Sequence, residues 1–434
     1  MHLISLAVTG IVILVILLFL GMNIGLTMAI VGFGGFWVIR GFTPAFGLLK
    51  TIPFSNAMNY SFTVIPLFIL MGQFAFHSGL SADLYEAADK WLSRFKGGLA
   101  MATVAACAGF AAICGSTAAT AATMSVVALP EMRRHGYHDG LATGALAAGG
   151  TLGILIPPST GFIIYGIIAE QSIGRLFAAG IFPGIVLALC YITSIAIQVR
   201  LHPELAPGRK KYPLKVMILS LKGTIGMVVL FLAVIGGMFA NLFTASEAAA
   251  LGAALSLCFM AIKRKFTWKT FVTALRDTVK TTAMVFLILI GAYIFGTFLA
   301  ITRLPMILAS FVQSLAVNRY VILAIIVAIY MVLGCLMDSL AMVTLTVPIF
   351  LPIIKSLGFD PIWYGVLMVM VMEMGLITPP VGMNVYIVAG VAKDVPLVTI
   401  FRGVTPMIFG MVVAIIIVIA FPQLSLWLPG LLFE

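Results

Sequence analysis

The sequence predicts an all-α integral membrane protein, and three observations carry that prediction. Hydrophobic residues make up 62% of the 434 residues, charged residues only 9%, and the mean hydropathy is +1.19. A soluble domain has about 45–50% apolar and roughly 25% charged residues, so no water-soluble fold could bury this much apolar surface. Apolar stretches of about 20 residues recur along the whole chain, which is typical of helices that span a lipid bilayer.

The net charge of +11 does not indicate a nucleic-acid partner. The basic residues occur in short clusters between apolar runs, as expected of loops that anchor a membrane protein. The N-terminus opens directly into an apolar run without the positive region of a cleaved signal, so residues 3–20 are predicted to be a retained span. The cysteines lie inside apolar runs without metal-ligand spacing and are interpreted as small packing residues: Cys107, Cys114, Cys190, Cys258 and Cys335.

Internal duplication divides the chain into two halves. LFILMG at 67–72 matches FLILIG at 286–291, and Gly115-Ser116 matches Gly334-Cys335 at the same separation. Pro157-Pro158 likewise matches Pro379-Pro380. We therefore predict a first repeat over 1–201, a polar linker over 202–213 and a second repeat over 214–434.

Each half shows the same order of segments: scaffold spans, an amphipathic arm, a hairpin, a broken helix and a closing span. In the first half these are scaffold 1–61, arm 81–96, hairpin 98–135, broken helix 139–170 and scaffold 173–201. In the second half they are scaffold 214–280, arm 304–318, hairpin 319–355, broken helix 361–392 and scaffold 397–434.

The two hairpins are predicted to be re-entrant. Their apolar segments, 98–113, 117–130, 320–333 and 338–354, are short beside the roughly 20 residues that a crossing needs. Non-helical backbone at membrane depth is tolerated only inside protein or beside a cavity, so the tips belong in the interior.

With re-entrant hairpins, the basic residues separate cleanly by side. Of the 25 Lys and Arg residues, 19 fall on one side, which should be cytoplasmic. The six on the other side are Arg40, Lys50, Arg175, Arg303, Arg319 and Lys355. Both termini are then periplasmic, and the hairpins open to opposite sides, as in inverted-repeat transporters.

A run of nine small residues, 115–123, sits at the first predicted tip. Close helix packing would explain such a run. At a hairpin tip, however, exposed carbonyls and hydroxyls could instead coordinate a cation, and helix N-termini could face an anion.

Two Pro-Pro breaks interrupt long helices at matching places. Proline cannot donate to the helix ladder, so carbonyls just before Pro157-Pro158 and Pro379-Pro380 lose their partners. A hard cation such as sodium is one way to satisfy those oxygens, and a simple kink is the alternative.

Isolated charges in apolar surroundings are the remaining candidates. Asp338 at the second tip could balance a cation or cap the helix that follows. Glu373 is interpreted as a buried acid that holds the broken helix, with a proton relay as the alternative. Thr244 and Glu247 form a capping-box pattern. Arg303 could clamp a carboxylate or anchor at the membrane interface.

No hydrolytic or nucleotide-binding motif appears. The sequence has no GxxxxGK[ST], HExxH or GxSxG pattern, and the five histidines do not cluster as ligands. The chain is therefore not expected to be an enzyme or to hydrolyse ATP by the P-loop route.

Four motifs together resemble the large membrane subunit of tripartite ATP-independent periplasmic (TRAP) transporters. They are GSTAATAATM at 115–124, Pro157-Pro158-Ser159, GCLMDSLAMV at 334–343 and EMGLITPPVGMN at 373–384. The resemblance implies a sodium-driven elevator transporter of the bacterial inner membrane that imports organic acids such as C4-dicarboxylates or sialic acids. It also implies two partners, a small four-helix membrane subunit and a periplasmic substrate-binding protein.

The resemblance also implies ligand positions for sodium and substrate. The first sodium site would use Ser116, Gly153, Ile156 and Pro158, and the second Gly334, Asp338, Thr378 and Val381. Substrate candidates between the tips are Thr120, Ser159, Arg303 and Asn384. Because Cys335 stands where the first half has Ser116, the two cation sites are expected to differ. A stand-alone sodium–carboxylate symporter or antiporter, and a channel or membrane scaffold, are the alternatives.

Overall fold

The structure is a computed structural model that describes residues 2–207, 212–315 and 317–433. Within those ranges the secondary structure is entirely helical, which confirms the all-α prediction. Residues 208–211 of the predicted linker and the two terminal residues, whose side of the membrane was predicted, lie outside the described residues. Eight of the described helices or helix pairs are long and apolar enough to cross a membrane.

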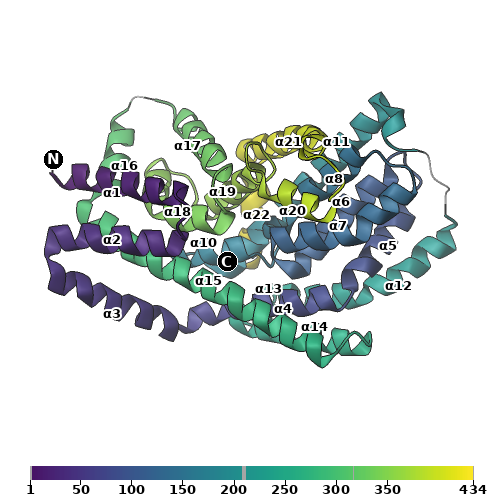
Figure 1. The fold of residues 1–434 in the computed structure, drawn as a ribbon, viewed down its shortest axis with the longest axis horizontal. Coiled ribbons are helices and arrows are strands. Elements are labelled where there is room, and N and C mark those ends of the chain that lie inside the picture. Colours follow the sequence, from purple (N-terminus) through teal and green to yellow (C-terminus); the bar gives the residue numbers. More distant parts are fainter. Residues whose placement is uncertain (1, 208–211, 316, 434) are drawn as a thin grey trace.

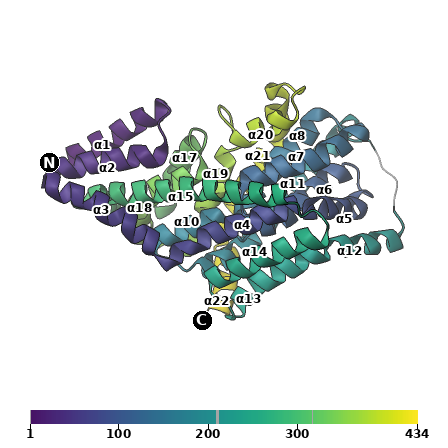
Figure 2. The same ribbon diagram turned by 60° about the horizontal axis from the view of Figure 1, so that its bottom comes forward.

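One group of helices forms the left and lower edges of the molecule in Figures 1 and 2. It consists of α1 (His2–Phe19), α2 (Ile24–Arg40), α3 (Phe42–Met58), α4 (Val64–His77), α12 (Leu214–Phe231), α14 (Ala245–Ile262) and α15 (Trp268–Thr302). Helix α3 was not predicted. It contains Gly47, Lys50 and Pro53, so its sequence lacks a long apolar run, and nearly all of its side chains stay at least partly exposed.

Close backbone contacts hold this group together. Helix α2 packs along α15, and α14 packs along α4. A Cβ at Gly25 or Gly32 would overlap the backbone of α15, so only glycine allows this approach. The predicted capping box at the start of α14 is confirmed, because Thr244 and Glu247 each accept a hydrogen bond from the other's backbone N–H.

The hairpins and the interrupted helices form the second group. The hairpins are α6 (Gly98–Cys114) with α7 (Thr117–Arg134), and α17 (Arg319–Gly334) with α18 (Ser339–Ser356). The interrupted helices are α8 (Asp139–Gly150), α9 (Leu152–Leu155) and α10 (Thr160–Ala169), then α19 (Pro361–Gly375) and α20 (Met383–Val391). At 16 to 18 residues, each hairpin helix is roughly 24–27 Å long, shorter than a hydrocarbon core of about 30 Å.

The two halves are interlocked in this second group. Helix α7 of the first hairpin packs on α20 of the second interrupted helix, and α18 of the second hairpin packs on α10 of the first. Each hairpin is therefore held by the opposite half of the chain.

The closing helices α11 (Ile173–Leu201) and α21 (Leu397–Ala420) pack against each other. We predicted that 173–201 and 397–434 belong to the scaffold; α21 also packs on α8, and α11 also packs on α22 (Gln423–Leu432), α6 and α19. A Cβ at Gly144 or Gly403 would overlap the backbone of the facing helix, which locks α8 against α21. The second closing span ends at Ala420, and α22 follows Pro422 as a separate helix.

Two amphipathic helices lie beside the hairpins, within the segments predicted as arms. Helix α5 (Leu80–Leu92) packs between α6 and α12, and α16 (Leu304–Ser314) packs on α18. The remaining short elements are η1 (Tyr60–Thr63), η2 (Pro203–Leu205), the π-helical turn η3 (Leu232–Gly236) and α13 (Gly237–Phe239).

Candidate functional site

A cavity of about 460 Å³ separates the two hairpin tips from α4 and α15. The tips and the second interrupted helix contribute Ser116, Thr117, Asp338, Ser339 and Asn384. Helices α4 and α15 contribute Gln73, Asp277 and Thr281 to the opposite wall. The cavity therefore lies between the two groups of helices that make up the fold.

Four helices begin at this cavity. The first residues of α7, α10, α18 and α20, which are Thr117, Thr160, Ser339 and Met383, all line it. The first N–H groups of a helix have no partner inside the helix, and each helix carries partial positive charge at its N-terminus. None of the described residues lining the cavity is Lys, Arg or His, so backbone dipoles are the positive groups that an anion would meet there.

The two tips are capped by different side chains. Ser116 Oγ accepts a hydrogen bond from the Ala119 N–H (3.4 Å), and Asp338 Oδ2 accepts one from the Leu340 N–H (3.2 Å). Ser116 therefore corresponds to Asp338, and our alignment of Ser116 with Cys335 was wrong. The reason is the tip length: Cys335 is the first residue after α17, and two further residues precede the cap.

The first tip rests on the first helix break. The Thr160 N–H and Oγ1 both donate to the Gly115 carbonyl, at 3.3 and 2.9 Å. A Cβ at Gly115 would lie 2.7 Å from the Pro158 carbonyl oxygen. A Cβ at Gly153 would lie 2.6 Å from the Ser116 carbonyl oxygen and 2.7 Å from Thr120 Oγ1. The structure thus brings together Ser116, Gly153 and Pro158 of the predicted first sodium site, with Ile156 at the end of α9.

The second tip rests on the second break. A Cβ at Gly375 would overlap the backbone of Gly334, so hairpin and broken helix touch through two glycines. Thr378 follows in the break, where its N–H donates to the Gly375 carbonyl (3.2 Å) and its Oγ1 to the Met374 carbonyl (2.6 Å). Val381 is 41% exposed. Of the four predicted ligands, only Asp338 lines the cavity.

Glu373 joins the two tips. Its side chain is fully buried, and it accepts a hydrogen bond from Thr117 Oγ1 at Oε2 (2.8 Å) and from Ser339 Oγ at Oε1 (3.1 Å). We predicted that Glu373 holds the broken helix. Its side-chain partners instead lie on the two hairpins, one from each half of the chain.

The predicted substrate residues fall in three different environments. Asn384 is 1% exposed and lines the cavity; its Nδ2 donates to the Ala147 carbonyl (3.2 Å), while its Oδ1 has no described partner. Thr120 Oγ1 is also buried without a described partner. Ser159 is fully buried and caps α10, where Oγ accepts from the Phe162 N–H and donates to the Ile154 carbonyl.

Arg303 is the predicted residue that the geometry separates from the others. It is exposed and ends α15, whereas Asp277 of the same helix lines the cavity. The 26 residues between them correspond to roughly 39 Å of helix. Arg303 therefore does not contact a ligand in this cavity.

Sequence reasoning missed the wall formed by α4 and α15. The predicted scaffold segment ended at residue 280 and Asp277 was given no role, but α15 begins at Trp268 and continues through both positions to Thr302. Residues 277, 281, 284 and 285 all line the cavity, and their spacing places them on one helix face. That periodicity was the available signal.

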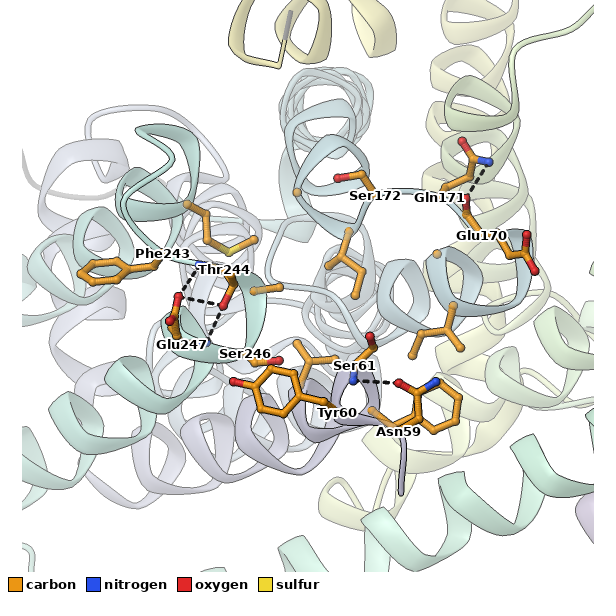
Figure 3. Close-up of a pocket in the computed structure, with 18 of the residues that line it drawn as sticks. Asn59, Tyr60, Ser61, Glu170, Gln171, Ser172, Phe243, Thr244, Ser246 and Glu247 are labelled. Carbon is orange, nitrogen blue, oxygen red and sulfur yellow. Dashed lines mark hydrogen bonds between the residues drawn. The ribbon is translucent and has the colours of Figure 1, made fainter. Parts of the chain in front are cut away.

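A second cavity of about 860 Å³ lies at the other end of α15, where Tyr293 lines it. Figure 3 shows its polar rim, formed by η1, by residues 170–172 between α10 and α11, and by residues 241–247. Glu247 in this rim is engaged in the capping box with Thr244. Tyr293 is 16 residues, or roughly 24 Å, along α15 from Asp277, so the two cavities lie at different depths of the same interface.

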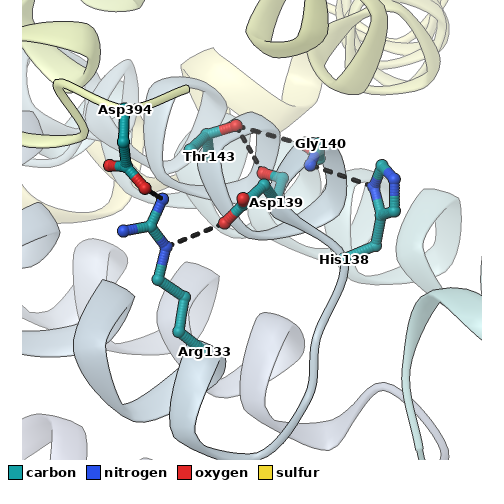
Figure 4. Close-up of polar contacts among 6 residues, drawn as sticks. All are labelled: Arg133, His138, Asp139, Gly140, Thr143 and Asp394. Atoms are coloured by element: carbon teal, nitrogen blue, oxygen red, sulfur yellow. Dashed lines mark hydrogen bonds and ion pairs between the residues drawn. The ribbon is translucent and has the colours of Figure 1, made fainter. Parts of the chain in front are cut away.

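An ionic cluster joins the end of α7, the start of α8 and the segment between α20 and α21 (Figure 4). Arg133, at the end of α7, donates through Nε to Asp139 Oδ1 (2.8 Å), and its terminal nitrogen pairs with Asp394 Oδ2 (2.8 Å). The contact with the guanidinium lowers the pKa of the Asp394 carboxyl. Asp394 lies between α20 and α21. The cluster therefore links the end of the first hairpin to the start of α8 and to the segment that follows α20.

The apolar helices, the hairpins facing each other and the cavities between two groups of helices define a polytopic membrane transport protein. Residues 11–424 match the family described as "Tripartite ATP-independent periplasmic transporter, DctM component", so the chain belongs to this family. It is a multi-pass inner-membrane transporter subunit and not an enzyme. The family implies a small membrane subunit and a periplasmic binding protein as its partners.

Relatives with assigned names agree with the family. The chain is 34% identical over 379 residues to the C4-dicarboxylate TRAP transporter large permease protein DctM of Pseudomonas aeruginosa, covering 87% of this chain and 88% of that protein. It is 31% identical over 418 residues to the sialic acid TRAP transporter large permease protein SiaM of Vibrio cholerae, covering 96% of each.

Two solved structures share the fold. The Alcanivorax borkumensis YdaH transporter gives a TM-score of 0.52 at 16% identity, covering 88% of this chain and 90% of that one. The Neisseria gonorrhoeae MtrF structure gives 0.56 at 14% identity, covering 89% and 85%.

Proposed function

We propose that this chain imports an organic acid, of the carboxylate class, by sodium-coupled elevator movement, with the acid delivered by a periplasmic binding protein. The observation that carries this proposal is the meeting of four helix N-termini at one cavity without a basic side chain. Such a site favours an anion. The two relatives named above are assigned to C4-dicarboxylate and sialic acid, and both are carboxylates.

The chemistry of the two tips suits sodium. Unwound backbone carbonyls and helix ends coordinate sodium in broken-helix transporters. At the first site these oxygens come from Ser116, Gly153, Ile156 and Pro158, with the unpartnered Thr120 Oγ1 beside them. At the second site they come from Gly334, Asp338, Thr378 and Val381, where the Asp338 carboxylate balances the cation.

The arrangement of helices supports inverted repeats and a moving body. The packing of α7 on α20 and of α18 on α10 is what a pseudo-two-fold axis between two halves would produce. The hairpins, interrupted helices, α11 and α21 would move together because they interlock. Helices α2, α4, α14 and α15 would stay fixed, and α5 and α16 would brace the moving body.

The charges indicate which side of the membrane each cavity faces. Lys269, Arg276 and Lys280 lie at the end of α15 that borders the tip cavity, so this end is cytoplasmic by the positive-inside rule. The cavity would then be the release side, with the larger cavity of Figure 3 facing the periplasm. A small four-helix subunit would extend the fixed scaffold.

The test is uptake by proteoliposomes that contain this chain and its small subunit. Labelled succinate and N-acetylneuraminate are presented with purified binding protein, with and without an inward sodium gradient, in the wild type and in Asp338→Ala. The matched control is Asp360→Ala, since Asp360 also caps a helix, accepting from Ile362 (2.7 Å), away from the cavity.

We expect uptake that needs both sodium and the binding protein, and that is lost in Asp338→Ala but kept in Asp360→Ala. Uptake that ignores the binding protein would establish a stand-alone symporter instead. Uptake that ignores sodium would overturn both cation sites.

A further inference from the structure

Glu373 occupies a position that neither a packing role nor a ligand role explains. It lies in α19, two residues before the Gly375 that touches Gly334 of the second tip. Its two carboxylate oxygens are divided between the hairpins, one accepting from Thr117 and the other from Ser339. A carboxylate that only stabilised α19 would need neither of these partners.

The two donors are equivalent residues. Thr117 is the first residue of α7 and directly follows the cap Ser116, while Ser339 is the first residue of α18 and directly follows the cap Asp338. Each hydrogen bond therefore reaches the residue next to a proposed sodium ligand. Any movement of one cap carries its neighbouring hydroxyl with it, and so changes the hydrogen bond at Glu373.

Burial makes this connection strong. Glu373 is fully buried and does not line the cavity, so water does not readily replace a donor that it loses. If one tip moves away, the buried Glu373 side chain loses half of its hydrogen-bond partners, so an arrangement that keeps both tips in contact with Glu373 is favoured.

We propose that Glu373 is a positioning residue that couples the two sodium sites, so that ordering one hairpin tip orders the other. This rests on the proposed function, because it requires that sodium binds at the two tips. The coupling makes sodium binding cooperative. A state with one tip ordered and the other open is therefore unfavourable during transport. Leakage of a single ion without its partner is thereby suppressed.

The experiment measures sodium binding directly. The purified chain with its small subunit is titrated with sodium while its melting temperature is followed, in the wild type, Thr117→Val, Ser339→Ala and Glu373→Gln. The matched control is Thr344→Val, because Thr344 is buried in α18 but donates only to carbonyls of its own helix, Leu340 and Ala341. The same variants are then assayed for the sodium dependence of uptake.

We expect a sodium Hill coefficient of about 2 in the wild type and in Thr344→Val, falling towards about 1 in each of the other variants, with two coupled sites setting the upper limit. Thr117→Val and Ser339→Ala should have similar effects, and their combination should add little, since either one already breaks the bridge. Half-saturating sodium should rise at least about fivefold, the lower end of typical coupling.

The proposal is overturned if the Hill coefficient in Thr117→Val and Ser339→Ala stays at the wild-type value. These two variants decide the question even if Glu373→Gln does not fold. A wild type that sodium stabilises cooperatively, with no change in the variants, removes the role of Glu373 and leaves the proposed function standing. A wild type that sodium neither stabilises nor drives would remove both.

Discussion

Replacing Gly153 by alanine tests the first sodium site most directly. Gly153 lies in α9, and an added Cβ would fall 2.6 Å from the Ser116 carbonyl oxygen and 2.7 Å from Thr120 Oγ1. Close carbon–oxygen contacts in proteins are about 3.3 Å or longer. The tip must therefore retreat by roughly 0.7 Å, which is the difference between 3.3 Å and the shorter of the two contacts, or the helix break must open.

The size of the effect follows from two opposing contributions. Overpacking of a tight interior costs about 1–3 kcal/mol. Alanine in a helix recovers about 0.5–1 kcal/mol relative to glycine, so the sodium-free protein should lose about 0–2.5 kcal/mol of stability. A displaced tip, by contrast, loses sodium affinity, and about 1–3 kcal/mol corresponds to a loss of roughly 5- to 150-fold.

The assay is the sodium titration of the melting temperature, with Gly390→Ala as the control. Gly390 lies in α20 with no atom within 4 Å of an added Cβ, so this variant makes the same chemical change in open space. We expect Gly390→Ala to match the wild type and Gly153→Ala to need far more sodium. If Gly153→Ala keeps a sodium affinity within about twofold of the wild type, the site does not lie there.

Three further results are expected. Arg303→Gln should leave the KM for substrate unchanged, since Arg303 is exposed far from the cavity. A marked rise in KM would instead support the predicted role of Arg303 in binding a substrate carboxylate. Asp277→Asn should raise the affinity for anionic substrate added on the cytoplasmic side, because Asp277 faces the cavity with no described ion pair; unchanged exchange kinetics would contradict this. Because contact with Arg133 lowers the pKa of Asp394, the pair stabilises the fold above the ordinary pKa of about 4 and loses this as the pH falls through the lowered value. Asp394→Asn should thus lower the melting temperature at neutral pH, and the difference should vanish in acid.

Features set by local sequence could be predicted. The capping box at Thr244 and Glu247 depends on residues three apart, and it forms as expected. The helices flanking each Pro-Pro pair end and resume close to the prolines, because proline lacks an N–H wherever it occurs. Helix α3 escaped prediction because its mixture of Phe, Pro, Gly and Lys matches neither a span nor a loop.

Features set by contacts between distant segments could not be predicted. The partners of Glu373 lie 256 and 34 residues away, and no local pattern indicates them. The neighbours of 173–201 and 397–434 could not be predicted for the same reason. Their apolar sequences are consistent with any buried neighbour, and only the close approach of Gly403 to Gly140 and Gly144 shows where α21 packs.

The alignment of the two halves failed at one place for a different reason. Gly115 directly follows α6, whereas Gly334 is the last residue of α17. Three residues separate Gly334 from the cap Asp338, and none separates Gly115 from the cap Ser116. A repeat aligned without a gap therefore places Cys335 opposite Ser116. Counting back from the Pro-Pro pairs instead would have placed Asp338 there, because the caps and the prolines keep the same separation in both halves.

The corrected correspondence explains how a cation and an anion can share one cavity. Helix N-termini that attract a carboxylate also repel a sodium ion nearby. At the second tip the Asp338 carboxylate would offset that repulsion. At the first tip Ser116 is neutral, so carbonyl oxygens would have to stabilise the cation instead. Under the proposed function, each bound sodium ion would strengthen the attraction for the anion, and by thermodynamic reciprocity the anion would strengthen the binding of sodium by the same factor. Such coupling would need no direct contact between substrate and sodium, only their proximity where the dielectric constant is low.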